Sequence, residues 1–355
     1  MFGPLTGEAA VLTATDPDLR ARLDEELAGV ASRFEAELAS ELECVNWLSA
    51  YVQRYRGKML RPSLVLLSGY ASSPDGRSLT EAHRVAATVV EMVHMATLVH
   101  DDILDEADLR RRGATINHLR GNEAAVMLGD YLISHAYHLC SSLDQPWISR
   151  AVGRVTNTVC EGELLQLENR QNLELDRRTY LEIIRRKTGS LCGLCCWLGA
   201  ALWREEAGTP GRDDGGVAGP LWRFGESLGV AFQVADDVLD IAGDTEQVGK
   251  TLGVDLRKGK LTLPVIITLE GLDAVERRGL VEELGQVGAA CPDDADDLLE
   301  GIRNRIIRAG ALETAREEAQ GLLDQGVEAG LALLSDSSAK GALRGLADRV
   351  IDRRV

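Results

Sequence analysis

Apolar residues recur every three or four positions through most of the chain, which is the pattern of amphipathic and buried α-helices. Strand-like alternation of apolar and polar residues is scarce. Aromatic residues make up only 4% of the sequence, which also disfavours an all-β fold. The pattern therefore predicts an all-α protein. The clearest helical runs cover residues 18–48, 79–104, 122–143, 150–169, 177–203, 221–241 and 310–334.

Three polar segments interrupt these runs, at residues 71–79, 207–220 and 285–297. The second is rich in Gly, Pro and Asp, which favours a surface loop between helices. None of the three is long enough to be a convincing domain linker, so we expect a single helical domain over residues 18–355. Residues 1–17 lack the helical pattern, and we expect this segment to be disordered.

The chain of 355 residues carries a formal net charge of −17. Such a chain repels nucleic acid and anionic lipid, so neither is an expected partner. An anionic substrate would also be repelled unless metal ions or local Lys and Arg residues invert the sign of the field.

Membrane insertion and secretion are not indicated. The longest apolar stretch, residues 191–203, is shorter than the roughly 20 residues that span a bilayer, and the N-terminal sequence lacks the pattern of a signal peptide. Seven cysteines, an odd number in a long chain, argue against a disulfide scaffold and favour the reducing cytoplasm.

Two aspartate clusters of identical spacing lie far apart, each late in an apolar helical run. The first reads DDILD from Asp101 to Asp105, and the second reads DDVLD from Asp236 to Asp240. Residues four apart share one face of a helix, so the first and last aspartates of each cluster form a carboxylate pair. Mg²⁺ relieves the repulsion within such a pair, because it binds one or two carboxylates and fills its other positions with water and phosphate oxygens.

Each cluster by itself is also compatible with a solvated acidic helix face. Two copies embedded in apolar helices are harder to explain in that way, so we expect both clusters, Asp102 and Asp237 included, to bind metal. A third acidic group at residues 293–297 follows Pro292 in a polar segment. Acids after a proline are typical of a helix N-terminus, and we exclude this group as a site.

Basic residues recur near both clusters and suit diphosphate recognition, Arg by its fork geometry and Lys as a point charge. Each of them could by itself be a solvated surface residue. Only their spacing relative to the aspartates makes them candidates for binding a diphosphate. They are Lys58, Arg61, Arg110, Arg111, Arg112, Lys187, Lys250 and Lys260.

Five segments together resemble the trans-isoprenyl diphosphate (polyprenyl) synthases: GKMLRP, LVHDDILDEADLRR, RRKTGS, FQVADDVLD and GKTLGVDLRKGK. They occur in the order and with the spacing of that family, from about residue 18 to the C-terminus. The resemblance implies a bundle of antiparallel helices around a deep central cavity, usually as a homodimer. It also implies that isopentenyl diphosphate is condensed head to tail onto an allylic diphosphate.

The resemblance assigns a role to each candidate residue by its position. It implies about three Mg²⁺ ions per active site, with Asp101, Asp105 and Asp236 as principal ligands and Asp102 and Asp240 in support. The isopentenyl diphosphate pocket would comprise Gly57, Lys58, Arg61, His94 and Arg111. The allylic diphosphate would be clamped by Arg110, Lys187 and Lys250. Lys260 would close over the site, and Thr188 and Gln233 would lie near the developing cation. The family often reads Arg-Arg-Gly where this chain reads RRRG, so the choice of inward-pointing arginines stays open.

The implied reaction is ionisation, condensation and elimination. Mg²⁺ and the basic residues would stabilise the departing pyrophosphate, and an apolar cavity would shield the cation from water. The leaving pyrophosphate could accept the final proton, which fits the lack of an evident protein base in the sequence.

Product length depends on the residues before the first cluster. Ala96 and Thr97 lie four to five positions before Asp101, about one helical turn of 5.4 Å, which is near the length of an isoprene unit. Family members that stop early carry aromatic residues there, whereas both residues are small here. This favours a product of about six to ten isoprene units. Other candidates for the end of the cavity are Tyr131, Leu132 and His135.

Several alternatives remain open at this stage. A farnesyl or geranylgeranyl synthase would need another residue to close the cavity early. A class I terpene cyclase would not need GKMLRP or a second full aspartate cluster. A non-catalytic subunit would be expected to have lost aspartates, and this chain keeps all six. A requirement for a small partner subunit is compatible with everything above.

Cys192, Cys195 and Cys196 lie at helical spacing and raise the possibility of a thiolate metal site. A structural zinc needs four ligands, and the sequence has no second Cys/His pair at a suitable distance. We therefore interpret the three cysteines as small packing residues of a buried helix.

Overall fold

The computed structural model describes residues 16–110, 113–204, 208–212, 216–242, 253–287 and 292–351. Helices make up most of the described chain, and the only strands in it are the short antiparallel pair β1 (Leu109–Arg110) and β2 (Gly113–Ala114). The predicted all-α fold is confirmed.

The chain divides into two compact units, whose boundaries fall within α7, α9, α10, α16 and α17. Unit 1 comprises Met1–Gly153, Leu194–Trp222 and Gly330–Arg349, and unit 2 comprises Arg154–Gly193, Arg223–Ala329 and Val350–Val355.

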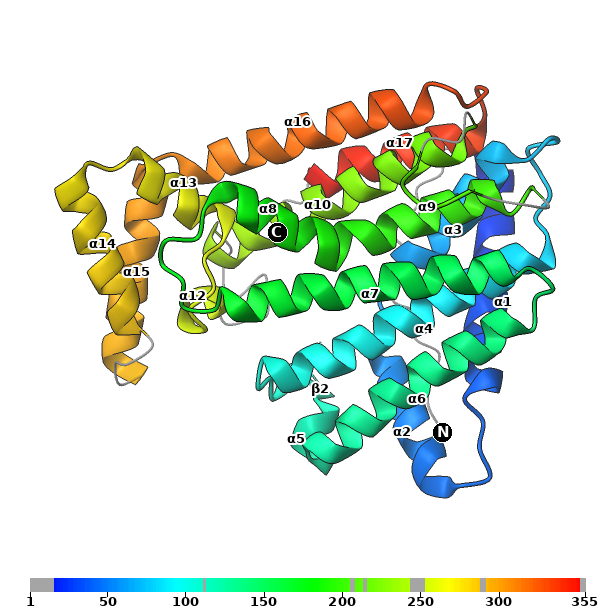
Figure 1. The fold of residues 1–355 in the computed structure, drawn as a ribbon, viewed down its shortest axis with the longest axis horizontal. Coiled ribbons are helices and arrows are strands. Elements are labelled where there is room, and N and C mark those ends of the chain that lie inside the picture. The colour runs from blue at the N-terminus through cyan, green and yellow to red at the C-terminus, as the bar shows by residue number, and fades with distance from the viewer. Residues whose placement is uncertain are drawn as a thin grey trace. The chain divides into compact units, whose positions relative to one another are not determined.

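Unit 1 is organised around α4 (Glu81–Leu104), which packs against α1, α3 and α6 (Figure 1). Side chains on every face of α4 are buried between Val85 and Val93, as expected of a helix that is apolar all round. A capping box between Thr80 and His83 fixes its N-terminus. The unit also contains α1 (Pro17–Glu37), α2 (Glu43–Val52), η1 (Gln53–Tyr55), α3 (Leu60–Ser72), α5 (Ile116–Arg120), α6 (Asn122–Ser141) and most of α17 (Ser338–Ile351).

Glycines bring α3 and α9 (Ser190–Ala201) into close contact within unit 1. A Cβ added at Gly199 would lie only 2.4 Å from the Val65 carbonyl oxygen and 2.6 Å from the Ser68 Cβ. The His83 ring bridges the same region, because its Nε2 lies 3.0 Å from the Gly199 carbonyl. The Trp203 indole donates to the Gly69 carbonyl at 2.9 Å. The packing of α3, α4 and α9 therefore depends on glycines at the point where α3 and α9 cross.

Unit 2 contains most of α7 (Pro146–Glu168) and α10 (Ala218–Ala242) together with the helices from α12 to α15 and most of α16. In this unit α13 packs on α8 and α15, and α14 lies beside α15 (Figure 1, yellow to orange). Arg177 ties α8 to α16 and α13 through ion pairs with Glu318 and Glu270. The remaining elements are α8 (Arg177–Ile184), η2 (Arg185–Gly189), α12 (Val254–Arg257), α13 (Leu263–Gly271), α14 (Ala274–Val287), α15 (Pro292–Arg308) and α16 (Ala311–Leu331).

Two predicted helical runs were wrong in detail. The run at 18–48 is two helices, because the chain turns between α1 and α2, where the Asn46 amide binds the Ser40 backbone at 2.9 and 2.7 Å. The run at 177–203 is interrupted by the π-helical turn η2. The acidic group after Pro292 does begin a helix, α15, as predicted.

The terminal segment predicted to be disordered lies outside the described residues up to position 15. Asp16 caps α1 by accepting from the Asp18 backbone N–H at 2.9 Å. No helix in the described part of the chain is long and apolar enough to cross a membrane.

Candidate active site

The first aspartate cluster forms the last turn of α4 in unit 1. Asp101 and Asp105 are half-buried, and Asp105 is the C-terminal cap, with its backbone N–H 2.8 Å from the Asp101 carbonyl. Glu106 follows in the left-handed region at φ 48° and ends the helix. The pair at i and i+4 therefore lies at the rim of a buried helix, where its carboxylates keep access to solvent.

The second aspartate of this cluster has different surroundings. Asp102 is only 1% exposed, and the Arg110 guanidinium donates to it through Nε at 2.9 and 3.0 Å and approaches it through Nη2 at 2.7 Å. The face of the Tyr55 ring lies 5.7 Å from the same guanidinium, and the Tyr55 hydroxyl accepts the Ile116 backbone N–H at 2.9 Å. Arg110, predicted to clamp a diphosphate, is thus anchored by Asp102 beside Asp101.

The second cluster repeats this arrangement on α10 in unit 2. Asp236 and Asp240 are half-buried, whereas Asp237 is 4% exposed. The Tyr180 hydroxyl donates to Asp237 Oδ2 at 2.5 Å, and the Gln233 amide donates to Oδ1 at 2.9 Å. Burial, and then the negative charge of Asp255, raise the pKa of Asp237 to about 8 although these hydrogen bonds work in the opposite direction.

The two clusters share one burial pattern, in which the first and fifth carboxylates are accessible and the second is held inside. Paired accessible carboxylates suit Mg²⁺, which takes one or two from the protein and completes its shell with water and phosphate oxygens. No group of three metal-ligating side chains is assembled among the described residues. Asp102 and Asp237 are buried and hydrogen-bonded inside the protein. This indicates that each of them holds the accessible carboxylates of its cluster in place.

Lys187 and Thr188 lie on the π-helical turn η2 between α8 and α9. Lys187 forms an ion pair with Glu163 of α7. The Thr188 hydroxyl donates to Gln233 Oε1 at 3.3 Å, and Gln233 in turn donates to Asp237. The structure thus joins three residues that the sequence suggested separately, Thr188, Gln233 and Asp237, in one hydrogen-bonded chain at the second cluster, with Lys187 next to Thr188 on the same turn.

The segment GKMLRP enters α3 through a left-handed residue, Met59, at φ 53° and ψ 40°. Non-glycine residues in this region carry local strain, which persists where the surroundings impose it and often marks functional sites. Lys58 is exposed, and Arg61 is half-buried in the first turn of α3. The positive end of the helix dipole and two cations at one helix start favour an anion. Gly57 and His94 are half-buried in the same unit.

The other candidates are placed as follows. Lys260 is half-buried after the left-handed Gly259, and its backbone N–H bonds to the Asp255 carbonyl at 2.9 Å. Arg111 and Lys250 lie outside the described residues. Thr97 is half-buried with its hydroxyl 2.7 Å from the His94 carbonyl, whereas Ala96 has no exposed surface. Of the further candidates for closing the cavity, Leu132 is buried, and Tyr131 and His135 are half-buried with their ring centroids 4.3 Å apart and their planes tilted by 57°.

Three residues that support the candidate active site were not predicted from the sequence: Glu163, Tyr180 and Tyr55. An acid in a helical run such as CEGELLQLE looks like any solvated glutamate, and the two tyrosines carry no local signal of their polar partners. Among the described cysteines no disulfide forms, and Cys192, Cys195 and Cys196 are buried in α9, in agreement with their interpretation as packing residues.

An all-helical chain with two solvent-accessible carboxylate pairs, each supported by a buried third aspartate, has the features of an enzyme that handles diphosphates through divalent cations. The sequence profile described as "Polyprenyl synthetase" matches residues 43–302. The chain belongs to the polyprenyl synthetase family and is a prenyltransferase of that family.

Individual relatives agree with this assignment. The chain is 33% identical over 331 residues to the octaprenyl diphosphate synthase of Escherichia coli K12, covering 93% of this chain and 96% of that protein. It is 33% identical over 327 residues to heptaprenyl diphosphate synthase component 2 of Geobacillus stearothermophilus, covering 92% and 95%. The crystal structure of a Caulobacter crescentus polyprenyl synthase complexed with calcium and isoprenyl diphosphate superposes with a TM-score of 0.83 at 28% identity, covering 97% of this chain and 99% of that one.

Proposed function

We propose that this protein is a Mg²⁺-dependent synthase that adds isopentenyl diphosphate head to tail to an allylic diphosphate and releases a trans-polyprenyl diphosphate longer than geranylgeranyl. The observation that carries the proposal is the repeated burial pattern of the aspartate clusters. Like charges at i and i+4 destabilise a helix, and a divalent cation bound by both carboxylates removes this repulsion.

Each carboxylate pair has a distinct supporting environment. Asp101 and Asp105 would hold Mg²⁺ at the end of α4, with Asp102 fixed by Arg110. Asp236 and Asp240 would do the same on α10, with Asp237 fixed by Tyr180 and Gln233. Mg²⁺, when bound, would supply the positive charge that neutralises diphosphate oxygens and stabilises the leaving pyrophosphate.

The protein's own residues then bind, orient and shield the substrates. Lys187 is carried beside the second cluster and is suited to bind diphosphate oxygens as a point charge. The hydroxyl of Thr188 and the amide oxygen of Gln233 present partial negative charge, which favours a nearby carbocation. Lys58 and Arg61 at the start of α3 are suited to the diphosphate of isopentenyl diphosphate. Arg111, Lys250 and Lys260 remain part of the proposal by their positions in the family motifs.

Product length is proposed from the residues before Asp101 and from the relatives. The side chain of Thr97 is small and half-buried one turn before the carboxylate pair. The related proteins of Escherichia coli and Geobacillus are named for products of eight and seven isoprene units. We therefore favour a product of about six to ten units, reached by successive additions along a helix-lined cavity.

Assembly and location belong to the same proposal. We expect one domain over residues 18–355, assembled as a homodimer and acting in the cytoplasm. The Geobacillus relative is named as component 2 of its synthase, which supports testing for a small partner subunit.

The deciding experiment is incubation of the purified protein with Mg²⁺, labelled isopentenyl diphosphate and geranyl, farnesyl or geranylgeranyl diphosphate, followed by resolution of the products by length. We expect incorporation that EDTA abolishes and products longer than geranylgeranyl. Asp101→Ala and Asp236→Ala should each lower kcat on the order of a thousandfold, whereas Asp297→Ala on α15 should behave as the wild type.

Each failure has a specific meaning. Unchanged turnover in Asp101→Ala would refute the role of the first carboxylate pair. A sharp stop at farnesyl or geranylgeranyl would refute the proposed product length but not the reaction. No incorporation with any primer would refute a self-sufficient synthase and would favour a partner subunit or a terpene cyclase.

A further inference from the structure

The π-helical turn η2 interrupts the α-helical backbone of unit 2 between α8 and α9. It carries Lys187 and Thr188, and the Ser190 backbone N–H bonds to the Arg185 carbonyl, five residues back rather than four. The Ser190 side chain is buried, and its hydroxyl donates to the Arg186 carbonyl at 2.5 Å. A π-turn inside an α-helix is rare, is often found at functional sites and needs support from its surroundings.

On one side, three consecutive residues of α7 support the turn. Glu161 forms an ion pair with Arg186, and Glu163 forms one with Lys187. Gly162 lies between them: a Cβ added there would be 2.7 Å from the Arg186 Cβ and 2.7 Å from the Lys187 backbone nitrogen. Real Cβ atoms essentially never come this close to a backbone atom, so only glycine allows α7 to approach the turn in this way.

On the other side, α10 supports the turn with the same combination of an acid and a glycine. Glu226 accepts from Arg185 at 3.2 Å. A Cβ added at Gly229 would lie 2.8 Å from the Gly189 Cα and 3.0 Å from the Thr188 carbonyl oxygen. One turn later on α10, Gln233 accepts the Thr188 hydroxyl.

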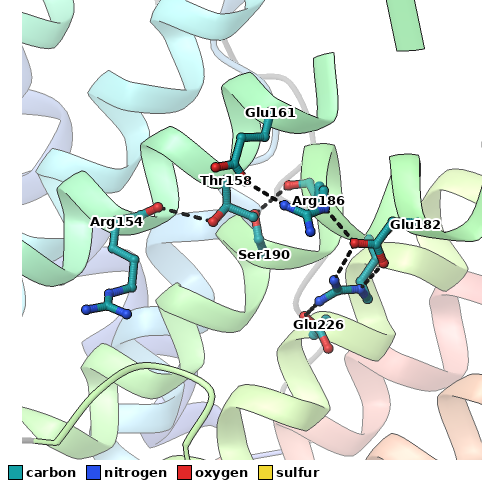
Figure 2. Close-up of polar contacts among 8 residues, drawn as sticks. Arg154, Thr158, Glu161, Glu182, Arg186, Ser190 and Glu226 are labelled. Atoms are coloured by element: carbon teal, nitrogen blue, oxygen red, sulfur yellow. Dashed lines mark hydrogen bonds and ion pairs between the residues drawn. The ribbon is translucent and has the colours of Figure 1, made fainter. Parts of the chain in front are cut away.

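The two arginines before Lys187 complete the support from within the chain. Figure 2 shows Arg186 between Glu161 of α7 and Glu182 of α8, with Glu226 of α10 below them in the view. Arg185 also binds Glu182, through two bonds of 2.9 and 2.8 Å. These half-exposed ion pairs contribute modest energy individually, but together they limit the movement of the turn along α7 and α10.

We propose that Gly162 and Gly229 are positioning residues that hold the π-turn, and through it Lys187 and Thr188, in the geometry needed for the reaction. This inference rests on the proposed function, in which Lys187 and Thr188 act on the allylic substrate. It also gives Arg185 and Arg186 a role: they fix the turn by ion pairs and do not contact the substrate.

The test is the variant Gly162→Ala, compared with the matched control Gly301→Ala on α15, where an added Cβ meets no atom within 4 Å. A displacement of about 1 Å at a catalytic group can cost on the order of 100-fold in rate. We expect kcat of Gly162→Ala to fall on the order of 10- to 100-fold, with the KM for isopentenyl diphosphate within about twofold of the wild type. Gly301→Ala should retain wild-type kcat and KM.

A double variant shows whether Gly162 acts through Lys187. If it does, Gly162→Ala should cost much less in a Lys187→Ala background than in the wild type, because the group that it positions is already absent. Fully additive losses would overturn the proposal. The proposal would also be overturned if a folded Gly162→Ala enzyme had the same kcat as Gly301→Ala. It would be overturned too if a smaller folded fraction accounted for the whole loss of kcat in Gly162→Ala.

Ser190→Ala and Gly229→Ala keep the test decisive if Gly162→Ala does not fold. Ser190→Ala introduces no clash and removes only the hydrogen bond to the Arg186 carbonyl, so the protein should fold and lose kcat by about three- to tenfold. Wild-type kcat in a folded Ser190→Ala enzyme would overturn the proposal in that case. Absence of turnover in the wild type would instead refute the proposed function, so the two failures are distinguishable.

Discussion

Single residues within one motif serve different purposes in this protein. Asp101 and Asp102 are neighbours, yet the first is accessible and the second is buried against Arg110. Asp102→Asn should therefore destabilise the fold, because it leaves a largely buried guanidinium without its countercharge, at a cost of about 2–4 kcal/mol. Urea unfolding would measure the difference in free energy.

The neighbouring position is the control for this prediction. Asp101→Asn removes one of two like-charged carboxylates and also a charge that favours the nearby Arg110, so it should lower the free energy of unfolding much less than Asp102→Asn, while it abolishes turnover. If both substitutions lowered stability equally, the distinction between accessible and buried aspartates would be wrong.

Ala96 and Thr97 are distinguished by their burial. A side chain that lines an open cavity keeps accessible surface in the unliganded protein, and Thr97 does so whereas Ala96 has none. We predict that Thr97→Phe shortens the products to geranylgeranyl or less without loss of stability. Ala96→Phe should instead overpack the core and cost about 1–3 kcal/mol. Product chromatography and thermal unfolding would separate the two, and unchanged product length in Thr97→Phe would contradict the assignment.

His83 makes the stability of the protein depend on pH. Burial lowers its pKa from 6.5 to about 4, even though the hydrogen bond to Gly199 favours the charged form. The unfolded chain therefore takes up a proton first, and stability is lost as pH falls from 6.5 towards 4. Between pH 7.5 and 5 this histidine alone should remove about 2 kcal/mol. The nearby Arg84 and Glu26 pair with each other at 2.6 Å and do not reverse the direction of this pKa shift.

Urea unfolding at the two pH values checks the His83 prediction. His83→Gln should be less stable than the wild type at pH 7.5 but should lose less on acidification, because it has no proton to take up. Equal pH dependence in the two proteins would show that other groups determine the acid sensitivity.

At the scale of elements, helix crossings in unit 1 depend on glycine. Gly199→Ala would place a Cβ 2.4 Å from the Val65 carbonyl oxygen, so α9 would have to move away from α3. We predict a loss of about 1–3 kcal/mol, measured by chemical unfolding. Gly301→Ala on an open helix surface should instead gain up to about 1 kcal/mol from helix propensity. A gain at both positions would mean that the α3–α9 crossing adapts freely.

The sequence predicted the long helices well, because an apolar repeat of three and four directly reports a buried helical face. It also predicted the aspartate pairs, because their i, i+4 spacing is local. It did not predict the π-turn, the Asp102–Arg110 pair or the Tyr180–Asp237 bond. These depend on which side chains from distant segments meet, and a close approach at Gly162 or Gly199 has no signature in the local pattern.

At the scale of the whole molecule, the net charge of −17 opposes the binding of a diphosphate. Lys and Arg residues near the clusters reduce this opposition, but Arg110 and Lys187 are partly neutralised by Asp102 and Glu163. The remaining positive charge has to come from the cations at the carboxylate pairs. Metal and diphosphate should therefore bind cooperatively, each raising the affinity for the other.

This cooperativity leads to a prediction for thermal stability. A ligand at 100 times its Kd stabilises the folded state by about 2.7 kcal/mol, which for a chain of this size raises Tm by about 3–4 °C. Mg²⁺ and inorganic pyrophosphate together should produce such a shift, whereas either alone should produce much less. Asp101→Asn combined with Asp236→Asn should abolish the shift, and Asp297→Asn should preserve it. An equal shift with pyrophosphate in EDTA would mean that lysines and arginines hold the anion without metal, and the aspartate pairs would then need another explanation.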